Sequence, residues 1–432
     1  ILSNNLYATD LKQVYQDALK NNKTYQQAKY TYKSTYTSYP TAVAALLPTA
    51  TITGNTTKTK KDHTNNNKFY TTKALDLTIT QTLFNWSDFK KLPKAGADVL
   101  VAKITYQIAK QNLIKSVITS YFDVLQAIDN LDYSNANLAS QNQSLNLTKE
   151  QLKVGLAAQT DVASAQAAYD QAYAQQVDAN NNLANKLEAI TVLTGKRYHD
   201  KDFLPLQNNF KSPSPNPKNI ELWANTAKQN NLSVLAAQAK VESSQKQIDV
   251  DYGGYIPSAS LTATLDHSKS QGSTTNTLTY KASANWNIGS YLALNNSAAT
   301  NTYYSIKKDK LTLQANQQAL QQAKRQAEMD SRTSYFNVSS DISQIKAYRQ
   351  AIISGQSAVK ASVAKYEAGI ESIINVLQQQ SALYQNQLNL SAGINTLFNH
   401  LADLKISIGA LSDKTINNIN SILAKKTKPN KK

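Results

Sequence analysis

Cysteine and histidine are the residues whose spacing would first reveal catalysis or metal binding in this chain. There is no cysteine, so thiolate metal sites, thiol nucleophiles and disulfides are excluded. The four histidines show no HExxH motif and no other ligand spacing, and we interpret them as surface and loop residues: His63, His199, His267 and His400. The glycines are too scattered for a phosphate-binding loop. We therefore expect no catalytic residue, no metal site and no cofactor.

Three aspartates follow one another along a predicted long helix. Asp123, Asp129 and Asp132 could form a cation site, because carboxylates are ligands for hard cations. A solvated or lumen-facing stripe of the same helix explains them better, and we favour that interpretation. The chemistry-bearing residues thus indicate a protein that does not catalyse a reaction.

Composition excludes a bundle of transmembrane helices. The chain has 432 residues, a formal net charge of +17 and a mean hydropathy of −0.47. Its longest uninterrupted apolar run, 42–47, is far shorter than the roughly 20 residues that a membrane helix needs. The first thirty residues show no secretory signal, as we expect of a mature chain from which a signal peptide has been removed. A content of 41% hydrophobic residues is ample for a buried core.

An internal repeat organises the chain. Four pairs of sites are each separated by 214 residues: Tyr121-Phe122 and Tyr335-Phe336, Gly155 and Gly369, Val162 and Val376, Gly195 and Gly409. Between the halves, three prolines at alternate positions exclude a helix or a central strand. We predict a first structural repeat over 1–210, a proline-rich linker over 211–219, a second repeat over 220–411 and a basic tail over 412–432.

Each repeat changes its hydrophobic period in the same order. Helical spacing from Leu11 to about Tyr39 ends at Pro40, and alternating residues then predict two strands of about ten residues. The second repeat shows the same alternation over 258–266 and 278–286. The strands have one apolar and one polar face, which fits both a half-buried soluble sheet and a membrane barrel. We place these β portions at about 47–84 and 256–288.

Aromatic residues near the predicted strand ends favour the barrel. Outer-membrane barrels carry aromatic girdles at both interfaces, whereas a soluble sandwich could use the same residues as plugs at its edge. The residues assigned to the girdle are Phe69, Tyr70, Phe84, Trp86, Tyr255, Trp286 and Tyr291.

Long helices follow the strands. Between Pro93 and Gly155 about sixty residues keep helical spacing, which corresponds to ~90 Å. Two adjacent apolar stripes favour neighbours on both sides, as in a closed ring of helices. We expect Gly155 to cap the end of this helix, Thr160 or Asp161 to cap the start of the next one, and the second repeat to behave alike around Gly369.

These features together resemble the TolC family of outer-membrane efflux ducts. The resemblance covers residues 6–411, and its most specific motifs are the segment 121–129, the turn 154–162, the turn 366–369 and the duplication itself. It implies a mainly α fold with a β membrane portion. Three chains would each give four strands to a twelve-stranded β-barrel, which continues into a long periplasmic α-helical barrel. Four strands cannot close a barrel alone, so oligomerisation is also required on physical grounds.

The resemblance also implies the function. The homotrimer would be a passive exit duct of a tripartite efflux or type I secretion system, in the outer membrane of a Gram-negative bacterium with a long periplasmic part. Its partners would be a periplasmic adaptor protein, an inner-membrane transporter and outer-membrane lipid or lipopolysaccharide. A basic helical nucleic-acid-binding protein, argued from the net charge of +17 and the tail 425–432, is one alternative. A structural stalk without a pore is another.

Finally, the resemblance assigns residues to three sites. The turns that meet the adaptor correspond to Val154, Gly155, Leu156, Ala368, Gly369 and Ile370. The periplasmic gate corresponds to Tyr366 and Asp161, with Thr160 and with Glu371 in the place of the family's arginine. The entrance constriction, which the family rings with aspartates, corresponds to the uncharged Asn375 and Gln378.

Overall fold

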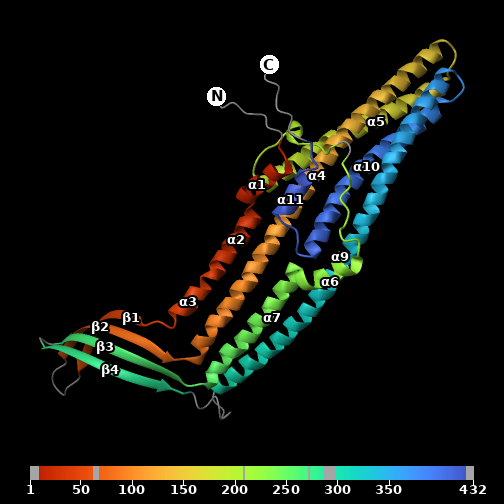
Figure 1. Cartoon of the computed structure of the whole chain (residues 1–432). Coiled ribbons are helices and arrows are strands. Elements are labelled where there is room, and N and C mark those ends of the chain that lie inside the picture. The colour runs from red at the N-terminus through yellow and green to blue at the C-terminus, as the bar shows by residue number, and fades with distance from the viewer. Residues whose placement is uncertain (1–8, 62–67, 208–209, 271–272, 287–296, 425–432) are drawn as a thin grey trace, which may run out of the picture. The chain divides into compact units, whose positions relative to one another are not determined.

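A computed structural model describes residues 9–61, 68–207, 210–270, 273–286 and 297–424 (Figure 1). The chain divides into two compact units. The first, called here the helical unit, holds the described residues of 1–28, 107–232 and 324–432. The second, called the strand unit, holds those of 29–106 and 233–323. Both units draw on both sequence repeats, and each is described by itself.

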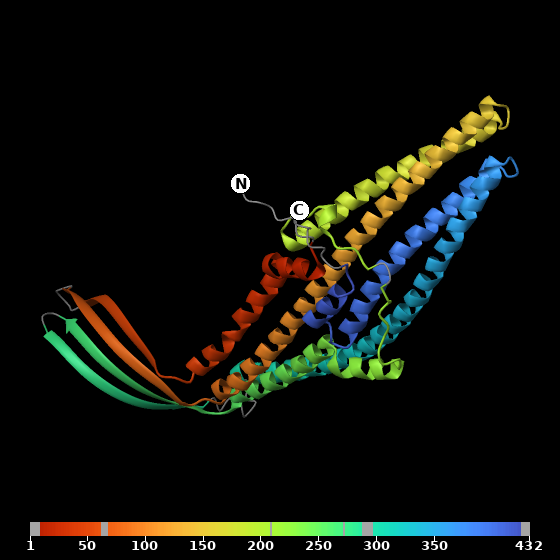
Figure 2. The same ribbon diagram turned by 45° about the horizontal axis from the view of Figure 1, so that its top comes forward.

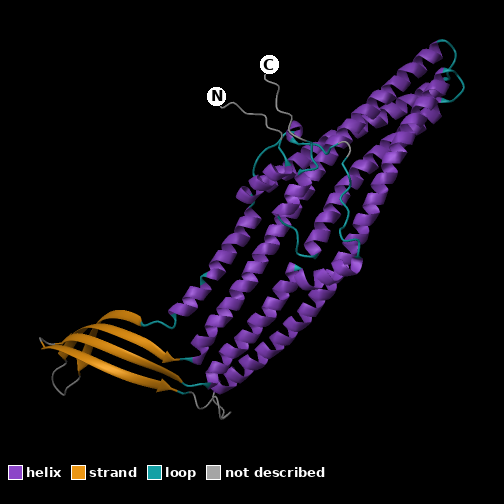
Figure 3. Ribbon diagram, viewed as in Figure 1, coloured by secondary structure: helices purple, strands orange, loops and turns teal. Residues whose placement is uncertain are grey.

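The strand unit contains one four-stranded antiparallel sheet, drawn in orange in Figure 3. Its strands are β1 (Thr49–Lys61), β2 (Lys68–Phe84), β3 (Ser258–Ser270) and β4 (Ser273–Asn285). They lie in the order β1-β2-β3-β4, so each repeat supplies one hairpin and β1 and β4 form the two edges. The strands are longer than the ten residues expected, because the pairing extends beyond the apolar alternation into Thr, Lys and Asn residues.

The register places the apolar residues of all four strands on one face. Two adjacent rows of Cα partners run across the sheet on this face: Ile52, Leu77, Leu265 and Leu278, and then Ala50, Ile79, Ala263 and Tyr280. The opposite face carries a row of hydroxyls from Thr51, Thr78, Thr264 and Thr279. Side chains alternate between faces with a period of two, so the pattern read from the sequence survives as two chemically distinct surfaces.

The helices of the N-terminal segment begin and end at different residues from those predicted. The N-terminal segment forms α1 (Leu11–Asn21), α2 (Lys23–Tyr36) and α3 (Ser38–Ala44), not one helix. The prediction that Pro40 ends the helix is wrong, because it lies in the first turn of α3, where a backbone N–H has no partner to lose.

The first long helix, α4 (Trp86–Lys153), also starts before the predicted residue. Pro93 lies inside it, although it removes one backbone hydrogen bond. Two side chains anchor the start of the helix: Trp86 Nε1 donates to the carbonyl of Asp249 at 2.9 Å, and Ser87 Oγ donates to that of Val250 at 2.9 Å. Hydrophobic periodicity does not reveal such tertiary hydrogen bonds, so the sequence did not predict where this helix starts.

Two long hairpins form most of the helical unit (Figure 2). In the first, α4 turns into α5 (Gln159–Thr194), and in the second, α9 (Ser297–Glu367) turns into α10 (Ile373–Ser407). Shorter elements accompany them: η1 (Asp200–Asp202), α6 (Ile220–Asn230) and α11 (Asp413–Asn420). In the strand unit, α7 (Leu232–Asp251) and η2 (Tyr252–Tyr255) precede β3. None of the helices in the described ranges combines the length and the hydropathy needed to cross a membrane.

The core of the helical unit forms around the first copy of the repeated dipeptide. Phe122 stacks on Phe398 with ring centroids 3.9 Å apart, and Tyr121 packs edge-on against Phe203. The Tyr121 hydroxyl donates to the carbonyl of Leu204 at 3.0 Å, so this buried phenol is satisfied. The core therefore joins α4, α10 and the segment that follows α5.

Both returning helices end in the same way. Gly195 and Gly409, the expected repeat pair, adopt left-handed φ values of 68° and 69° beyond the ends of α5 and α10. An asparagine amide closes each end: Asn22 Nδ2 donates to the carbonyl of Leu193 at 3.4 Å, and Asn231 Nδ2 to that of Ser407 at 2.9 Å. The two repeats thus share a bond as well as a sequence pattern.

Candidate functional site at the ends of the helical hairpins

The turn between α4 and α5 is a compact helix ending. Gly155 has a φ of 78°, its N–H donates to the carbonyl of Leu152 at 3.0 Å, and the N–H of Leu156 donates to that of Gln151 at 2.8 Å. These two bonds define a Schellman motif, which requires a left-handed residue and is therefore typical of glycine. The prediction that Gly155 caps this helix is confirmed.

The turn between α9 and α10 repeats this geometry. Gly369 has a φ of 72°, its N–H donates to the carbonyl of Tyr366 at 3.0 Å, and that of Ile370 donates to Lys365 at 2.9 Å. In both turns a Cβ added to the glycine would meet no atom within 4 Å. The space around each tip is open.

The residues after the two glycines leave large apolar side chains uncovered. Leu156 and Ile370 are each 77% exposed, and Val154 and Ala368 are exposed beside them. In an ordinary Schellman ending the residue after the glycine packs back on its own helix. Here both tips instead offer an apolar side chain outward. The six residues expected to meet an adaptor therefore lie at the ends of the two hairpins, and all six are exposed.

The start of α5 differs from the prediction. Neither Thr160 nor Asp161 occupies the N-cap position, which belongs to Ala158. Asp161 stands three residues later, and its carboxylate accepts the N–H of Ala158 at 3.0 Å. This is the reciprocal half of a capping box, so Asp161 still stabilises the helix start, from inside the first turn.

The two residues of the proposed gate, Tyr366 and Asp161, make separate hydrogen bonds within one chain. Tyr366 is buried, and its hydroxyl donates to Thr148 Oγ1 of α4 at 3.0 Å. Around it, a cluster from all four hairpin helices includes Leu145, Ala165 and Ile373. Tyr366 thus fastens the second hairpin to the first, while Asp161 caps its own helix.

Glu371, Asn375 and Gln378 lie at the start of α10. Asn375 Nδ2 donates to Glu371 Oε1 at 3.2 Å, and the other carboxylate oxygen of Glu371 is buried without a hydrogen-bond partner. Asn375 and Gln378 are exposed. Gln378 also lines a cavity of about 380 Å³ between α4, α5 and α10, whose polar lining includes Asn137, Gln171 and Gln175. No charged side chain lines this cavity.

The aromatic residues expected in a girdle fall into three groups. Phe69 and Phe84 lie on the leucine face of the sheet, whereas Tyr70 belongs to the face that carries the threonines. Trp86 and Tyr255 belong to α4 and η2, and Trp286 follows β4. Tyr291 lies outside the described residues, as do His63 and the tail 425–432.

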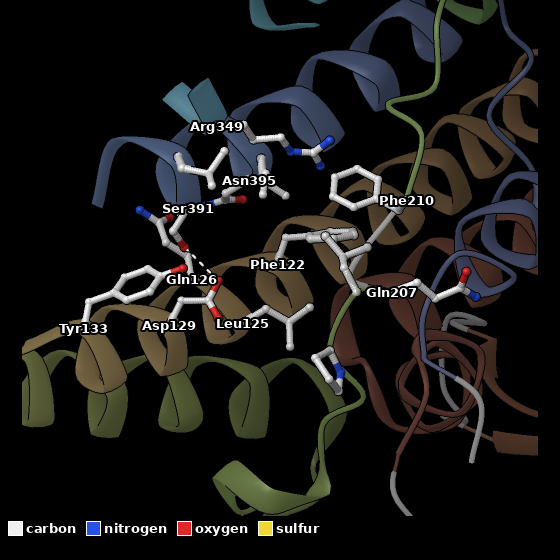
Figure 4. A pocket seen from close by; sticks show the side chains of 14 residues that line it. Phe122, Leu125, Gln126, Asp129, Tyr133, Gln207, Phe210, Arg349, Ser391 and Asn395 are labelled. Carbon is white, nitrogen blue, oxygen red and sulfur yellow. Dashed lines mark hydrogen bonds between the residues drawn. The ribbon is translucent and has the colours of Figure 1, made fainter. Parts of the chain in front are cut away.

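A second cavity, of about 260 Å³, lies beside the core of the helical unit (Figure 4). Asp129 from α4 lines it, together with Arg349 from α9 and Phe210, and the guanidinium of Arg349 lies 4.8 Å from the Phe210 ring centroid. Burial raises the pKa of Asp129 to about 6, although Ser391 Oγ donates to its carboxylate at 3.0 Å.

The three aspartates do not share one environment. Asp123 pairs with Lys186 Nζ at 2.9 Å, Asp129 is half-buried beside the cavity, and Asp132 is exposed. The solvated or lumen-facing stripe that we favoured for these aspartates stays a prediction. Within the described ranges no group of three or more metal-ligating side chains is present. His400 also differs from the surface residue expected, because its Nδ1 lies 2.7 Å from Asp341 Oδ2 between α9 and α10.

Sequence reasoning missed the partner of Tyr366. Beyond the apolar stripe of α4, the buried face of this helix continues with polar residues. These are Ser134, Gln141, Ser144 and Thr148. Gln380 from α10 donates to Ser144 on this face at 3.1 Å. These positions lie three, four or seven residues apart, so helical spacing alone would have identified them. They were missed because only apolar residues were used to trace the buried face of the helix.

Comparisons with known proteins agree with this geometry. A family model described as "Outer membrane efflux protein" matches residues 14–196 and 223–410. Outer membrane protein TolC of Escherichia coli K12 is 30% identical over 98% of this chain and 87% of its own length. Alkaline protease secretion protein AprF of Pseudomonas aeruginosa is 22% identical over 96% of this chain and 87% of its own.

A solved structure shows the same fold. The Campylobacter jejuni CmeC outer membrane channel superposes with a TM-score of 0.81 at 16% identity, over 95% of this chain and 88% of that one. The predicted fold class and the predicted role as an outer-membrane exit duct are confirmed. Because the family model spans well over half of the sequence and the match to TolC almost all of it, this chain belongs to the outer membrane efflux protein family.

Proposed function

We propose that three copies of this chain form a passive exit duct of a tripartite efflux or type I secretion system, in the outer membrane of a Gram-negative bacterium. Each copy gives its four strands to one twelve-stranded barrel and its two hairpins to a periplasmic helical barrel. A periplasmic adaptor protein and an inner-membrane transporter deliver the cargo.

The two faces of the sheet are the observation that carries the proposal. One face exposes leucine, isoleucine and tyrosine rows across all four strands, and the other exposes threonine rows. Four strands with free edges β1 and β4 cannot exclude lipid from their backbone groups. Three copies joined edge to edge remove every edge, with the apolar rows toward lipid and the hydroxyl rows toward water.

The helices also need further copies. Large apolar side chains are exposed on the described parts of α5 and α9 in the helical unit: Tyr173, Val177, Val192, Met329, Phe336 and Ile353. We take these exposed apolar side chains as part of an interface between copies. Neighbouring copies in a ring supply the missing cover, which supports a homotrimer over an isolated stalk.

The hairpin ends carry the proposed contacts with partners. The exposed Leu156 and Ile370 offer apolar contacts to an adaptor, and the compact glycine turns allow close approach. Tyr366 and Asp161 belong to the proposed gate, with Thr160 and Glu371 beside it. Asn375 and Gln378 belong to the proposed entrance, where they provide hydrogen bonds but no charge.

Purification in detergent followed by planar-bilayer recording tests the proposal. We expect a trimeric mass and stepwise ion conductance from the full-length protein. A trimer without conductance would point to a structural stalk, and a monomer that binds DNA with a steep salt dependence would point to the nucleic-acid alternative. Either result would overturn the duct.

A further inference from the structure

The leucine face of the sheet becomes basic at the end of the strands that carries the hairpin turns. Along β3 the face stays apolar from Ala259 to Leu265, a length of about 20 Å. The next row contains His267, and the row after it pairs Lys73 of β2 with Lys269 of β3 as direct Cα partners. Lys58 of β1 follows one row further out, opposite Thr71. We call Lys58, Lys73 and Lys269 the lysine cluster.

The members of the lysine cluster are exposed and carry like charges at close quarters. Direct cross-strand neighbours have Cβ atoms about 5 Å apart, and like charges in that position destabilise a sheet. Lys58 Nζ also lies 5.0 Å from the centroid of the Phe69 ring on the same face. A cation beside an aromatic ring, at the end of an apolar band, is the chemistry of a boundary between lipid tails and polar headgroups.

The sheet itself offers this cluster no countercharge. Over the described strands the carboxylates are Asp76 and Asp266, which are partners of each other on the threonine face. The lysine cluster stands on the leucine face, so the pleat separates it from both. The anion that balances the cluster must therefore come from outside the sheet.

We infer that the lysine cluster binds the phosphate groups of lipopolysaccharide in the outer leaflet. The inference rests on the proposed function, which turns the leucine face toward lipid and the helices toward the periplasm. The hairpin-turn end of the strands then lies at the outer leaflet. An ammonium group binds phosphate as a point charge, and three chains repeat the cluster around the barrel.

Lipid retention by the purified trimer measures this binding. The test compares the unchanged protein with Lys58→Gln/Lys73→Gln/Lys269→Gln, using native mass spectrometry after incubation with lipid A, dephosphorylated lipid A or phosphatidylglycerol. We expect lipid A retention to fall about fivefold for each lysine removed. Dephosphorylated lipid A and phosphatidylglycerol should be retained weakly by both proteins.

A matched control removes the same charge elsewhere. Lys103→Gln/Lys281→Gln/Lys414→Gln changes exposed lysines of α4, of the threonine face and of α11, and should retain lipid A like the unchanged protein. If the first triple variant inserts poorly, the double variant Lys73→Gln/Lys269→Gln and the charge-preserving triple Lys→Arg variant give the same test. We expect the double Lys→Gln variant to lose lipid A retention and the triple Lys→Arg variant to keep it.

Several outcomes would overturn the inference. These are equal lipid A retention by the cluster variant and the unchanged protein, an equal loss in the control variant, or equally strong retention of phosphatidylglycerol. Conductance and trimeric mass are measured on the same samples. If the protein forms a conducting trimer and the lysine substitutions leave its lipid A retention unchanged, only this inference is refuted. If the unchanged protein neither forms trimers nor conducts ions, the proposed function is refuted.

Discussion

The phenylalanine of the repeated dipeptide has opposite surroundings in the two repeats. Phe122 is 1% exposed and stacks on Phe398, whereas Phe336, 214 residues later, is 62% exposed. In the first copy, Phe122 stacks on Phe398 of α10 and Tyr121 packs against Phe203, and Phe210 packs on Phe398 in turn. Within one chain Phe122 belongs to the core, whereas in the second copy Tyr335 packs against a core cluster and Phe336 stays exposed. Equal sequence thus marks equal helix position, while the surroundings decide the role.

Replacing each of the two phenylalanines with alanine should give the largest difference between the two repeats. Phe122→Ala removes a stacked, fully buried ring, and should lower the free energy of unfolding by about 4 kcal/mol. Phe336→Ala should leave the folded chain within about 0.5 kcal/mol but weaken the trimer. Thermal unfolding measures the first effect, and native electrophoresis of detergent-solubilised trimers measures the second. Equal losses of chain stability in both variants would refute the division of roles.

The two repeats also differ in charge at one equivalent position, where the first repeat has Asp129 and the second has the exposed Ser343. The folded-state pKa of about 6 lies above the ordinary value of 3.8, so ionisation opposes folding. This penalty is absent below pH 3.8, grows as the pH rises through 6 and is complete above it. Asp129→Asn should therefore stabilise the protein at pH 8 by at most about 3 kcal/mol and have little effect near pH 4.

Thermal unfolding across this pH range measures the effect of Asp129. The matched control is Asp178→Asn on α5, which is exposed and should show no such pH dependence. A gain for Asp129→Asn that is equally large at pH 4 and pH 8 would show that packing, and not the carboxylate charge, is responsible.

The two tips, in contrast, are alike, and matched substitutions should affect them alike. Gly155→Leu and Gly369→Leu force a side chain into a left-handed conformation at a cost of about 1–2 kcal/mol each, and place bulk where Leu156 and Ile370 are exposed. We expect normal trimer yield and lost drug tolerance in cells. Gly→Asn at either tip tolerates the same φ and should retain more export. Unchanged drug tolerance in both leucine variants would contradict the proposed adaptor contact.

Tyr366 differs from its repeat counterpart Leu152, because only the tyrosine can donate to Thr148. Tyr366→Phe keeps the ring in its cluster and removes one hydrogen bond, worth about 1 kcal/mol. If this bond restrains the gate, single-channel conductance should rise, and Thr148→Val should raise it equally. A conductance unchanged in both variants would remove Tyr366 from the gate.

The smallest effect is expected where Asp161 of the first repeat is matched by Asn375 of the second. The carboxylate of Asp161 accepts a hydrogen bond from the start of its own helix, and Asn375 carries no charge. We therefore expect the entrance to bind multivalent cations weakly. Block of conductance by a trivalent cation from the periplasmic side measures this. Asn375→Asp/Gln378→Asp should convert weak block into strong block, whereas strong block of the unchanged channel would implicate Glu371.

Much of the fold followed from periodicity. Alternation over 50–54 and 258–266 predicted the two-faced sheet, and glycine spacing predicted both tip turns, because these patterns depend on local backbone geometry. The start of α4 and the partner of Tyr366 were missed, since both depend on tertiary hydrogen bonds to Asp249 and Thr148. The domain boundaries and the residues assigned to the gate, entrance and adaptor contacts stay predictions.

The paired asparagine amides have a consequence for symmetry. Asn22 and Asn231 close the returning helices of the two repeats with equivalent bonds, so each repeat is a near-copy of one building block. A ring of three such chains then has six near-equivalent blocks, and its threefold axis is also an approximate sixfold axis. A sixfold arrangement of partner hairpins would meet two kinds of tip in alternation, one ending in Leu156 and the other in Ile370.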